Sequence, residues 1–400
     1  MSELKIFRAK YIYPVSSPVI EDGIVATAKG RIIAVGPYRQ LKDLGVVFDL
    51  GEVVLMPALV NAHVHLELSA LKWRLTPTGS FISWVKSLIK GRTEVGEDEA
   101  KEAAWQAVRE MWHEGVGVIA DIGNTPLALS ALESSPVEGI FFREIINFRN
   151  GSREFKELVG LGRTPGIRIS LSAHSPYTVS PLLLQAIKAW TRSRRSIFSI
   201  HVAECPEEVL FLKEGSGPIR FLLEERGQWN PSFRPPEMSP VAYLHSLGLL
   251  DQRTLCVHVV QVDLEDLELI SRTGASVCLC PRSNTFLGVG LPPVERFLAL
   301  GIRPALGTDS LASNDRLSIF AEMATVARFF PRIPPEEIIK MGTIYGARAL
   351  GLERDWGSLE QGKRAAFLSL RIDGLGLAAE DLAGFLTTSS HPPELSWIYG

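Results

Sequence analysis

The stretch Pro57–Ser69, with the sequence PALVNAHVHLELS, decides how this chain folds. It follows the apolar run Val53–Met56 and contains the pair His63-x-His65. Residues two apart in an extended strand project to the same face, so the pair predicts two imidazoles side by side at a strand end. Such imidazoles suit adjacent positions on one metal ion. An isolated His-x-His is more often two unrelated histidines, so further signals must decide.

Three later strand ends supply those signals. Downstream apolar segments carry single polar residues at or near their ends: SIHVAE at His201, CVHVVQV at His258 and LGTDS at Asp309. Chance does not readily place four such sites at successive strand ends. The pattern therefore favours one site assembled from distant parts of the chain.

Strands alternate with helices from Val53 onwards, which is typical of a parallel α/β fold. We predict strands near 53–65, 115–123, 139–147, 167–175, 197–204, 254–262, 275–284 and 302–310. Amphipathic helices between them include 98–114, 180–194, 264–273 and 294–300. Eight such units predict a (β/α)8 TIM barrel. The segment 226–240, which contains GQWNPSFRPPEMSP, is a candidate lid loop.

Both chain ends show strand and turn chemistry instead. Residues 1–56 contain short strand segments with a turn signal at Lys29-Gly30, and GSLEQGKRAAFLSL near the C-terminus returns to this pattern. We therefore predict a small β-sandwich domain formed by both chain ends, residues 1–56 and 357–400, around a barrel at 57–356.

The composition is that of an ordinary globular enzyme, with 400 residues, 46% hydrophobic residues and a net charge of -3. Nothing in this charge balance indicates a nucleic-acid or membrane partner, and we expect a small-molecule substrate. The first residues have no apolar core with a cleavage site, and the four cysteines lie in or beside apolar segments. Buried reduced thiols favour a cytoplasmic protein.

The residue types at the strand ends predict a metal site. Three neutral imidazoles and the Asp309 carboxylate suit Zn²⁺ or Fe²⁺, and the sequence does not choose between them. A metal there would lower the pKa of a water ligand towards neutrality. We expect Asp309 to accept a proton from that water as well as to bind the metal.

Two more residues are candidates for proton transfer. His258 is placed to hydrogen-bond the nucleophile or the developing alkoxide. Glu204, three residues after His201, is placed to pass a proton to the substrate's ring nitrogen or leaving group.

These motifs carry a resemblance to a known family. The segments LVNAHVHLELS, SAHSPYTVSP, SIHVAE, SPVAYLHSLGLL, CPRSN, LGTDSLASN and GSLEQGK span nearly the whole chain. Together they resemble the deaminase and chlorohydrolase branch of the amidohydrolase superfamily. The resemblance implies that the metal ligands are His63, His65, His201 and Asp309, with Glu204 as proton shuttle.

The resemblance also implies a subtype. Binuclear members carry a lysine or glutamate at the end of strand four, whereas LSAHSP places His174 there, so one divalent metal ion per chain is favoured. His174 then faces the substrate. Asn284 matches a family motif, with a turn-fixing role as the alternative. Glu67 recurs in HVHLE of similar deaminases and is a candidate for substrate contact, with a strand-end salt bridge as the alternative.

An aromatic pocket for a planar base is a further expectation. Trp73, Phe81 and Trp84 follow the first barrel strand, although helix packing explains the last two as well. Substrates of similar deaminases carry a distant carboxylate, for which Arg is the preferred partner. Arg74 and Arg149 are the candidates, and solvated surface charges are the alternative.

The leading hypothesis is an aminohydrolase acting on an adenine-type nucleoside, with aminodeoxyfutalosine of menaquinone biosynthesis as the most specific expectation. The same machinery also fits a chlorohydrolase, a guanine deaminase or a cyclic amidase, and a barrel that binds a ligand without turnover is the non-enzymatic alternative. Similar proteins commonly form dimers, so the resemblance is compatible with a homodimer.

Overall fold

The protein is described by a computed structural model that covers residues 4–41, 45–77, 79–149, 166–389 and 393–400. The chain divides into two compact units. One comprises Met1–Asn61, Glu110–Val118 and Ser318–Gly400, and the other comprises Ala62–Arg109 and Ile119–Leu317.

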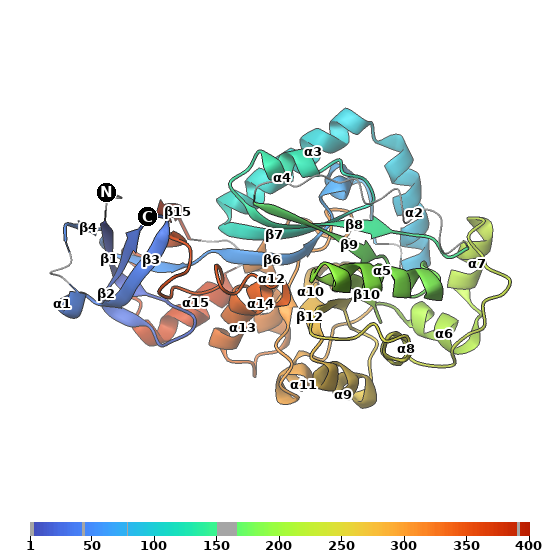
Figure 1. Ribbon diagram of the computed structural model, residues 1–400. Coiled ribbons are helices and arrows are strands. Elements are labelled where there is room, and N and C mark those ends of the chain that lie inside the picture. Colours follow the sequence, from blue (N-terminus) through green and yellow to red (C-terminus); the bar gives the residue numbers. More distant parts are fainter. Residues whose placement is uncertain (1–3, 42–44, 78, 150–165, 390–392) are drawn as a thin grey trace. The chain divides into compact units, whose positions relative to one another are not determined.

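The two chain ends meet in one sheet of seven strands. Its order is β15-β14-β5-β1-β2-β3, with β4 also paired to β1. The strands are β1 (Lys5–Ile12), β2 (Ile20–Ala28), β3 (Arg31–Pro37), β4 (Val47–Asp49), β5 (Val53–Pro57), β14 (Ala366–Arg371) and β15 (Leu395–Tyr399). The first and last strands of the chain, β1 and β15, both belong to this sheet (Figure 1). The expectation that both ends build the small domain is therefore confirmed.

A tight turn joins β2 to β3 where the sequence predicts one. Lys29 and Gly30 both have positive φ, 55° and 69°. A two-residue hairpin turn of this kind matches the twist of the flanking strands, and glycine adopts that conformation without steric cost.

The second sheet has eight strands in the order β13-β12-β11-β10-β9-β8-β7-β6. They are β6 (Leu59–Val64), β7 (Val116–Gly123), β8 (Glu138–Ile145), β9 (Ile167–Ala173), β10 (Phe198–Val202), β11 (Thr254–His258), β12 (Ser276–Leu279) and β13 (Ala305–Leu306). A parallel bridge from Val64 to Asp309 links the first strand to the end of the last. The fold is a TIM barrel, as predicted.

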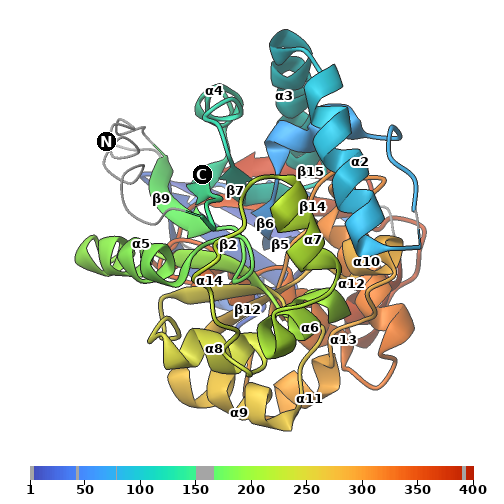
Figure 2. The same cartoon turned by 90° about the vertical axis from the view of Figure 1, so that its right-hand side faces the viewer.

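Helices follow most of the barrel strands, and α5, α8 and α9 lie outside the strands (Figure 2). The α-helices are α1 (Tyr38–Leu41), α2 (Phe81–Glu94), α3 (Glu97–His113), α4 (Leu129–Glu133), α5 (Pro181–Ser193), α6 (Pro206–Glu214), α7 (Pro218–Glu225), α8 (Pro240–Ser246), α9 (Leu264–Thr273), α10 (Pro281–Leu287), α11 (Val294–Ala299), α12 (Ile319–Phe329), α13 (Pro335–Met341), α14 (Ile344–Ala349) and α15 (Leu382–Thr388). Two 3₁₀ turns are η2 (Leu66–Leu71) and η4 (Ala379–Asp381). The four predicted helices correspond to α3, α5, α9 and α11.

Three predicted strands differ clearly from the observed ones, and in the last of them, 302–310, only Ala305–Leu306 is a strand. The run 53–65 is two strands, because β5 ends at Pro57 in the small sheet and β6 begins at Leu59 in the barrel. Proline has no N–H to continue a ladder, which marks the break. The run 275–284 ends as a strand at Leu279, and Pro281 opens α10. Proline is favoured at the first position of a helix, and the helix that begins at Pro281 includes Asn284.

Three further findings concern the cysteines, the segment 226–240 and the helices. All four cysteines are buried and form no disulfide. Within the segment 226–240, Trp229 and Phe233 pack against Phe148 and Phe211 in the apolar core of the barrel unit. Among the residues that the structure describes, no helix has the length and apolar character needed to cross a membrane.

Candidate metal and catalytic site

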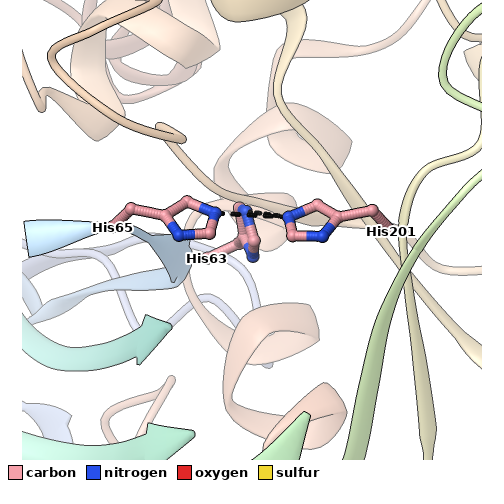
Figure 3. A group of neighbouring side chains, drawn as sticks. All are labelled: His63, His65 and His201. Atoms are coloured by element: carbon pink, nitrogen blue, oxygen red, sulfur yellow. Dashed lines mark hydrogen bonds between the residues drawn. The ribbon is translucent and has the colours of Figure 1, made fainter. Parts of the chain in front are cut away.

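Three histidines from two barrel strands converge on one point. His63 lies in β6, His65 directly follows it, and His201 lies in β10. The Nε2 atom of His201 is 3.2 Å from the Nε2 atoms of both His63 and His65. Figure 3 shows the rings directing these nitrogens toward a common centre. The His-x-His pair and the distant His201 are therefore brought together.

The donor spacing fits a metal ion. Nitrogens about 2.0–2.1 Å from one tetrahedral ion lie roughly 3.3–3.4 Å apart, close to the observed separations. The ring Nδ1 of His201 donates to the backbone oxygen of His174 at 2.8 Å. With its proton on Nδ1, the ring presents a lone pair on Nε2, as a metal ligand must.

Asp309 places one carboxylate oxygen beside this histidine cluster. Its Oδ1 lies 3.8 Å from His63 Nε2 and 3.7 Å from His65 Nε2. Its Oδ2 accepts hydrogen bonds from Ser283 Oγ at 2.6 Å and Ser313 Oγ at 2.8 Å. The two hydroxyls thus hold one oxygen and leave the other aimed at the imidazoles.

Strained backbone positions direct these side chains. Ala203, His258 and Asp309 have positive φ of 54°, 74° and 55°. Such a conformation costs of order 1–3 kcal/mol at a non-glycine residue, and it is common at active sites. Gly307 lies so close that an added Cβ would be 2.7 Å from the Cβ of His63. The glycine of LGTDS therefore lets the last strand approach the first.

Burial keeps the imidazoles of His65 and His201 neutral. Burial is the main cause that lowers the pKa of His65 to about 3 and that of His201 well below its usual value. Burial raises the pKa of Asp309, but the neighbouring His63, His65 and His258 outweigh it and hold that pKa well below its usual value. Neutral nitrogens beside a carboxylate are the donors that a divalent metal needs.

Glu204 and His258 form a second pair beside the cluster. His258 Nε2 lies 3.4 Å from Glu204 Oε1. The Asn284 side-chain amide donates to His258 Nδ1 at 3.1 Å, which leaves the His258 proton on Nε2. Burial, with the charges of Asp309 and Glu208, raises the pKa of Glu204 well above its usual value. A protonated Glu204 is suited to act as a general acid.

A turn held by Glu208 positions Glu204. The Glu208 carboxylate accepts from the backbone N–H groups of Ala203 and Glu204, both at 3.0 Å. This pair of hydrogen bonds stabilises the strained Ala203. Sequence reasoning missed Glu208, although it follows Glu204 by four residues at the start of α6.

Five of these residues border one cavity of about 470 Å³, within the range of small-molecule sites. Its lining includes His65, His201, Glu204, His258 and Asp309, with apolar walls that include Phe81, Trp84, Leu88, Tyr177 and Leu222. The Trp84 indole N–H donates to the oxygen of Ala312 at 3.2 Å, which fixes the ring. Trp73 is 74% exposed and is not among the lining residues that the structure describes.

Hydrogen bonds connect four of the residues that line the cavity, namely Glu67, Arg92, Asn124 and Glu144. Glu67 accepts from Arg92 at 3.1 Å and from the backbone and hydroxyl of Thr125. Arg92 also donates to Asn124 Oδ1 at 2.7 Å, and Asn124 donates to Glu144 Oε2 at 2.7 Å. Glu67 therefore both borders the cavity and forms the salt bridge that was its alternative.

His174 borders the same cavity, with its ring Nδ1 2.7 Å from Thr178 Oγ1. Glu144, His174 and His201 also have potential ligand atoms close together. His201 already uses its Nδ1 in the hydrogen bond to the His174 oxygen. We therefore assign the metal site to the cluster that includes His63 and His65.

The two arginines selected from the sequence lie elsewhere. Arg74 pairs with Glu99 on α3, and Arg149 is exposed and contacts the backbone oxygen of Gly227 at 3.4 Å. Neither is among the described lining residues, whereas Arg92 and Arg226 are. Sequence reasoning also missed Asn124 and Glu144. Asn124 directly follows β7 and Glu144 is the last residue but one of β8, so both positions fall under the strand-end rule that found His201.

A TIM barrel with histidine and carboxylate ligands at the C-terminal ends of its strands has the architecture of a metal-dependent hydrolase. The chain belongs to the amidohydrolase family, whose sequence model matches residues 54–385. It is therefore a hydrolase, and the resemblance noted in its motifs is confirmed.

Known proteins resemble this chain over most of its length. An aminodeoxyfutalosine deaminase of Deinococcus radiodurans is 31% identical over 74% of this chain and 73% of its own. A 5-methylthioadenosine/S-adenosylhomocysteine deaminase of Moorella thermoacetica is 30% identical over 88% of this chain and 82% of its own. The structure of Helicobacter pylori aminofutalosine deaminase with methylthio-coformycin has a TM-score of 0.86 at 24% identity, covering 97% of both chains. That last likeness concerns the fold.

Proposed function

We propose that this protein is a metal-dependent aminohydrolase that deaminates an adenine-type nucleoside. The observation that carries the proposal is the approach of His63, His65 and His201 to one centre beside the buried pair Glu204 and His258. The deaminase names of both curated relatives support it.

One divalent ion per chain fits the donor set, with His63, His65, His201 and Asp309 as the residues that would hold it. Three imidazoles and a carboxylate suit Zn²⁺, and they also accept Fe²⁺. Such an ion, when bound, supplies Lewis-acid activation of water at neutral pH.

The chain's own residues move the protons. Glu204, protonated in its buried position, donates to a ring nitrogen of the substrate and makes the adjacent carbon more electrophilic. Asp309 accepts a proton during attack by water, because its Oδ1 faces the site and its Oδ2 is held by two hydroxyls. His258 positions Glu204 through their 3.4 Å contact. The exocyclic amine gains a proton and leaves as ammonia, and the oxygen of the attacking water takes its place on the ring carbon.

The cavity supports a planar ring with a polar extension. Phe81, Trp84 and Tyr177 supply aromatic walls for a base, and Arg226 supplies a cation at the cavity lining. Arg226 forms no ion pair with any residue that the structure describes, so its guanidinium is available to a substrate carboxylate. Aminodeoxyfutalosine, which the D. radiodurans relative is named for, is the most specific substrate that we propose.

A deamination screen tests the proposal. Purified protein loaded with Zn²⁺ or Fe²⁺ is given adenosine derivatives that differ in the 5′ group, and ammonia release is measured. We expect turnover of at least one derivative and highest kcat/KM for one with a 5′ carboxylate. Release of chloride from a chlorotriazine, with no ammonia from any adenosine derivative, would instead establish the chlorohydrolase alternative.

A further inference from the structure

His65 is held differently from the other candidate ligands. It lies one residue beyond the end of β6, so it stands outside the strand ladder. The ring of His201 is fixed by the hydrogen bond from its Nδ1 to a backbone oxygen. Among the residues that the structure describes, the His65 ring has polar contacts only through Nε2, to His201 and Asp309. The direction of the His65 ring therefore depends on its backbone.

The backbone after His65 forms the 3₁₀ turn η2, which begins at Leu66. The first N–H groups of a helical turn have no acceptor within the turn, and a Ser, Thr, Asp or Asn side chain just before it usually supplies one. His65 occupies that position here, and its side chain makes no such hydrogen bond. Its imidazole points to the histidine cluster instead (Figure 3).

Asp121 supplies the missing acceptor from the next strand of the barrel. It lies in β7, which pairs with β6. Its Oδ1 accepts from the backbone N–H of Leu66 at 2.9 Å, and the residue is fully buried. Asp121 thus ties the residue directly after His65 to the barrel wall.

Fold stability alone does not explain a carboxyl group at this position. Its Oδ2 has no hydrogen-bond partner among the residues that the structure describes, and a buried oxygen without a partner costs free energy. Burial also raises the pKa of Asp121 to about 8. A neutral carboxyl group still accepts through its carbonyl oxygen, so the Leu66 N–H needs an acceptor there but not a charge.

We propose that Asp121 is a positioning residue, which directs the His65 imidazole to the metal ion by holding the backbone N–H of Leu66. This inference rests on the metal site of the proposed function and adds a residue to it. Asp121 is not among the described residues that line the cavity, so it acts through His65 and not on the substrate.

The experiment compares metal binding by the full-length wild type, Asp121→Leu and Asp121→Asn. Asp121→Leu removes the acceptor at similar size and should weaken Zn²⁺ binding by about 10- to 100-fold in competition with a chelator, the range for groups that orient a metal ligand. The visible spectrum of its Co²⁺ form should also change, because the ligand geometry changes. Asp121→Asn keeps the acceptor and should bind Zn²⁺ within about 3-fold of wild type.

Asp263→Leu is the matched control. Asp263 caps α9, where its Oδ1 accepts from the Asp266 N–H at 3.0 Å. This variant should lose thermal stability and keep the wild-type Zn²⁺ affinity, because its helix carries no metal ligand.

Two results would overturn the positioning role. One is a folded Asp121→Leu with the Zn²⁺ affinity and Co²⁺ spectrum of wild type. The other is failure of both Asp121→Leu and Asp121→Ala to fold while Asp263→Leu folds, since Asp121 would then be only a structural cap. In either case a wild type that binds Zn²⁺ and deaminates leaves the proposed function standing. A wild type that binds no metal refutes both.

Discussion

His201 donates a hydrogen bond from its ring Nδ1 to the backbone carbonyl oxygen of His174 across 2.8 Å. The acceptor belongs to the backbone at the end of the fourth barrel strand, so it persists whatever side chain stands at position 174. His174 thus orients the ring of His201 through its backbone oxygen and presents its own imidazole to the cavity. These two roles are separable by mutation.

His201→Ala should therefore lower the metal content, and His174→Ala should leave it unchanged. The first removes a ligand and should abolish stoichiometric metal and activity. The second keeps the carbonyl and should retain metal, while kcat/KM falls through loss of a substrate contact. Elemental analysis with circular dichroism checks both, and His245→Ala, exposed on α8, is the control. Full metal in His201→Ala would refute the ligand assignment.

Glu204→Gln should keep metal and lose turnover by roughly 10²-fold or more, the scale of general acid catalysis. The amide retains the shape of the side chain but has no acidic proton to give. Steady-state kcat is the measurement. Glu207→Gln, on the same turn, should retain wild-type kcat. An unchanged kcat in Glu204→Gln would leave Glu204 with a structural role.

Ser283 and Ser313 should tune metal affinity, because their hydroxyls hold Oδ2 of Asp309 at 2.6 and 2.8 Å. Replacing both with Ala should weaken metal binding by about 10- to 100-fold, as is usual for partners of a metal ligand. Competition with a chelator gives the affinity. Thr285→Ala, whose hydroxyl bonds the backbone oxygen of Pro281, is the matched control and should bind metal normally.

The carboxylate anchor can be located by comparing Arg226→Met with Arg149→Met. Arg226 borders the cavity, and Arg149 does not appear among its described lining residues. We expect Arg226→Met to raise KM by about 10- to 100-fold for a substrate with a 5′ carboxylate and to leave adenosine nearly unchanged. Arg149→Met should match wild type with both. The reverse result would restore the anchor predicted from the sequence.

The local sequence was sufficient to predict the barrel and the residues at the centre of the candidate site. Alternation of strands and helices, and polar residues at strand ends, predict where His63, His65, His201, His258 and Asp309 lie, because parallel strands bring their C-terminal ends to one edge. The same rule reaches Glu144 and Asn124, which lie at strand ends without a metal-binding pattern to distinguish them.

Other features depended on contacts between distant residues. The local pattern predicts one strand over 53–65. In the structure, β5 pairs with β14 and β6 pairs within the barrel, so the run divides at Pro57. Arg74 and Arg149 both follow barrel strands, which made them candidates for a substrate anchor. In the structure, Arg74 pairs with Glu99 and Arg149 is exposed. The sequence determines which residues reach the strand ends, because side-chain period and turn chemistry are local. Tertiary structure decides which of them face the cavity, because that depends on neighbours far apart in the chain.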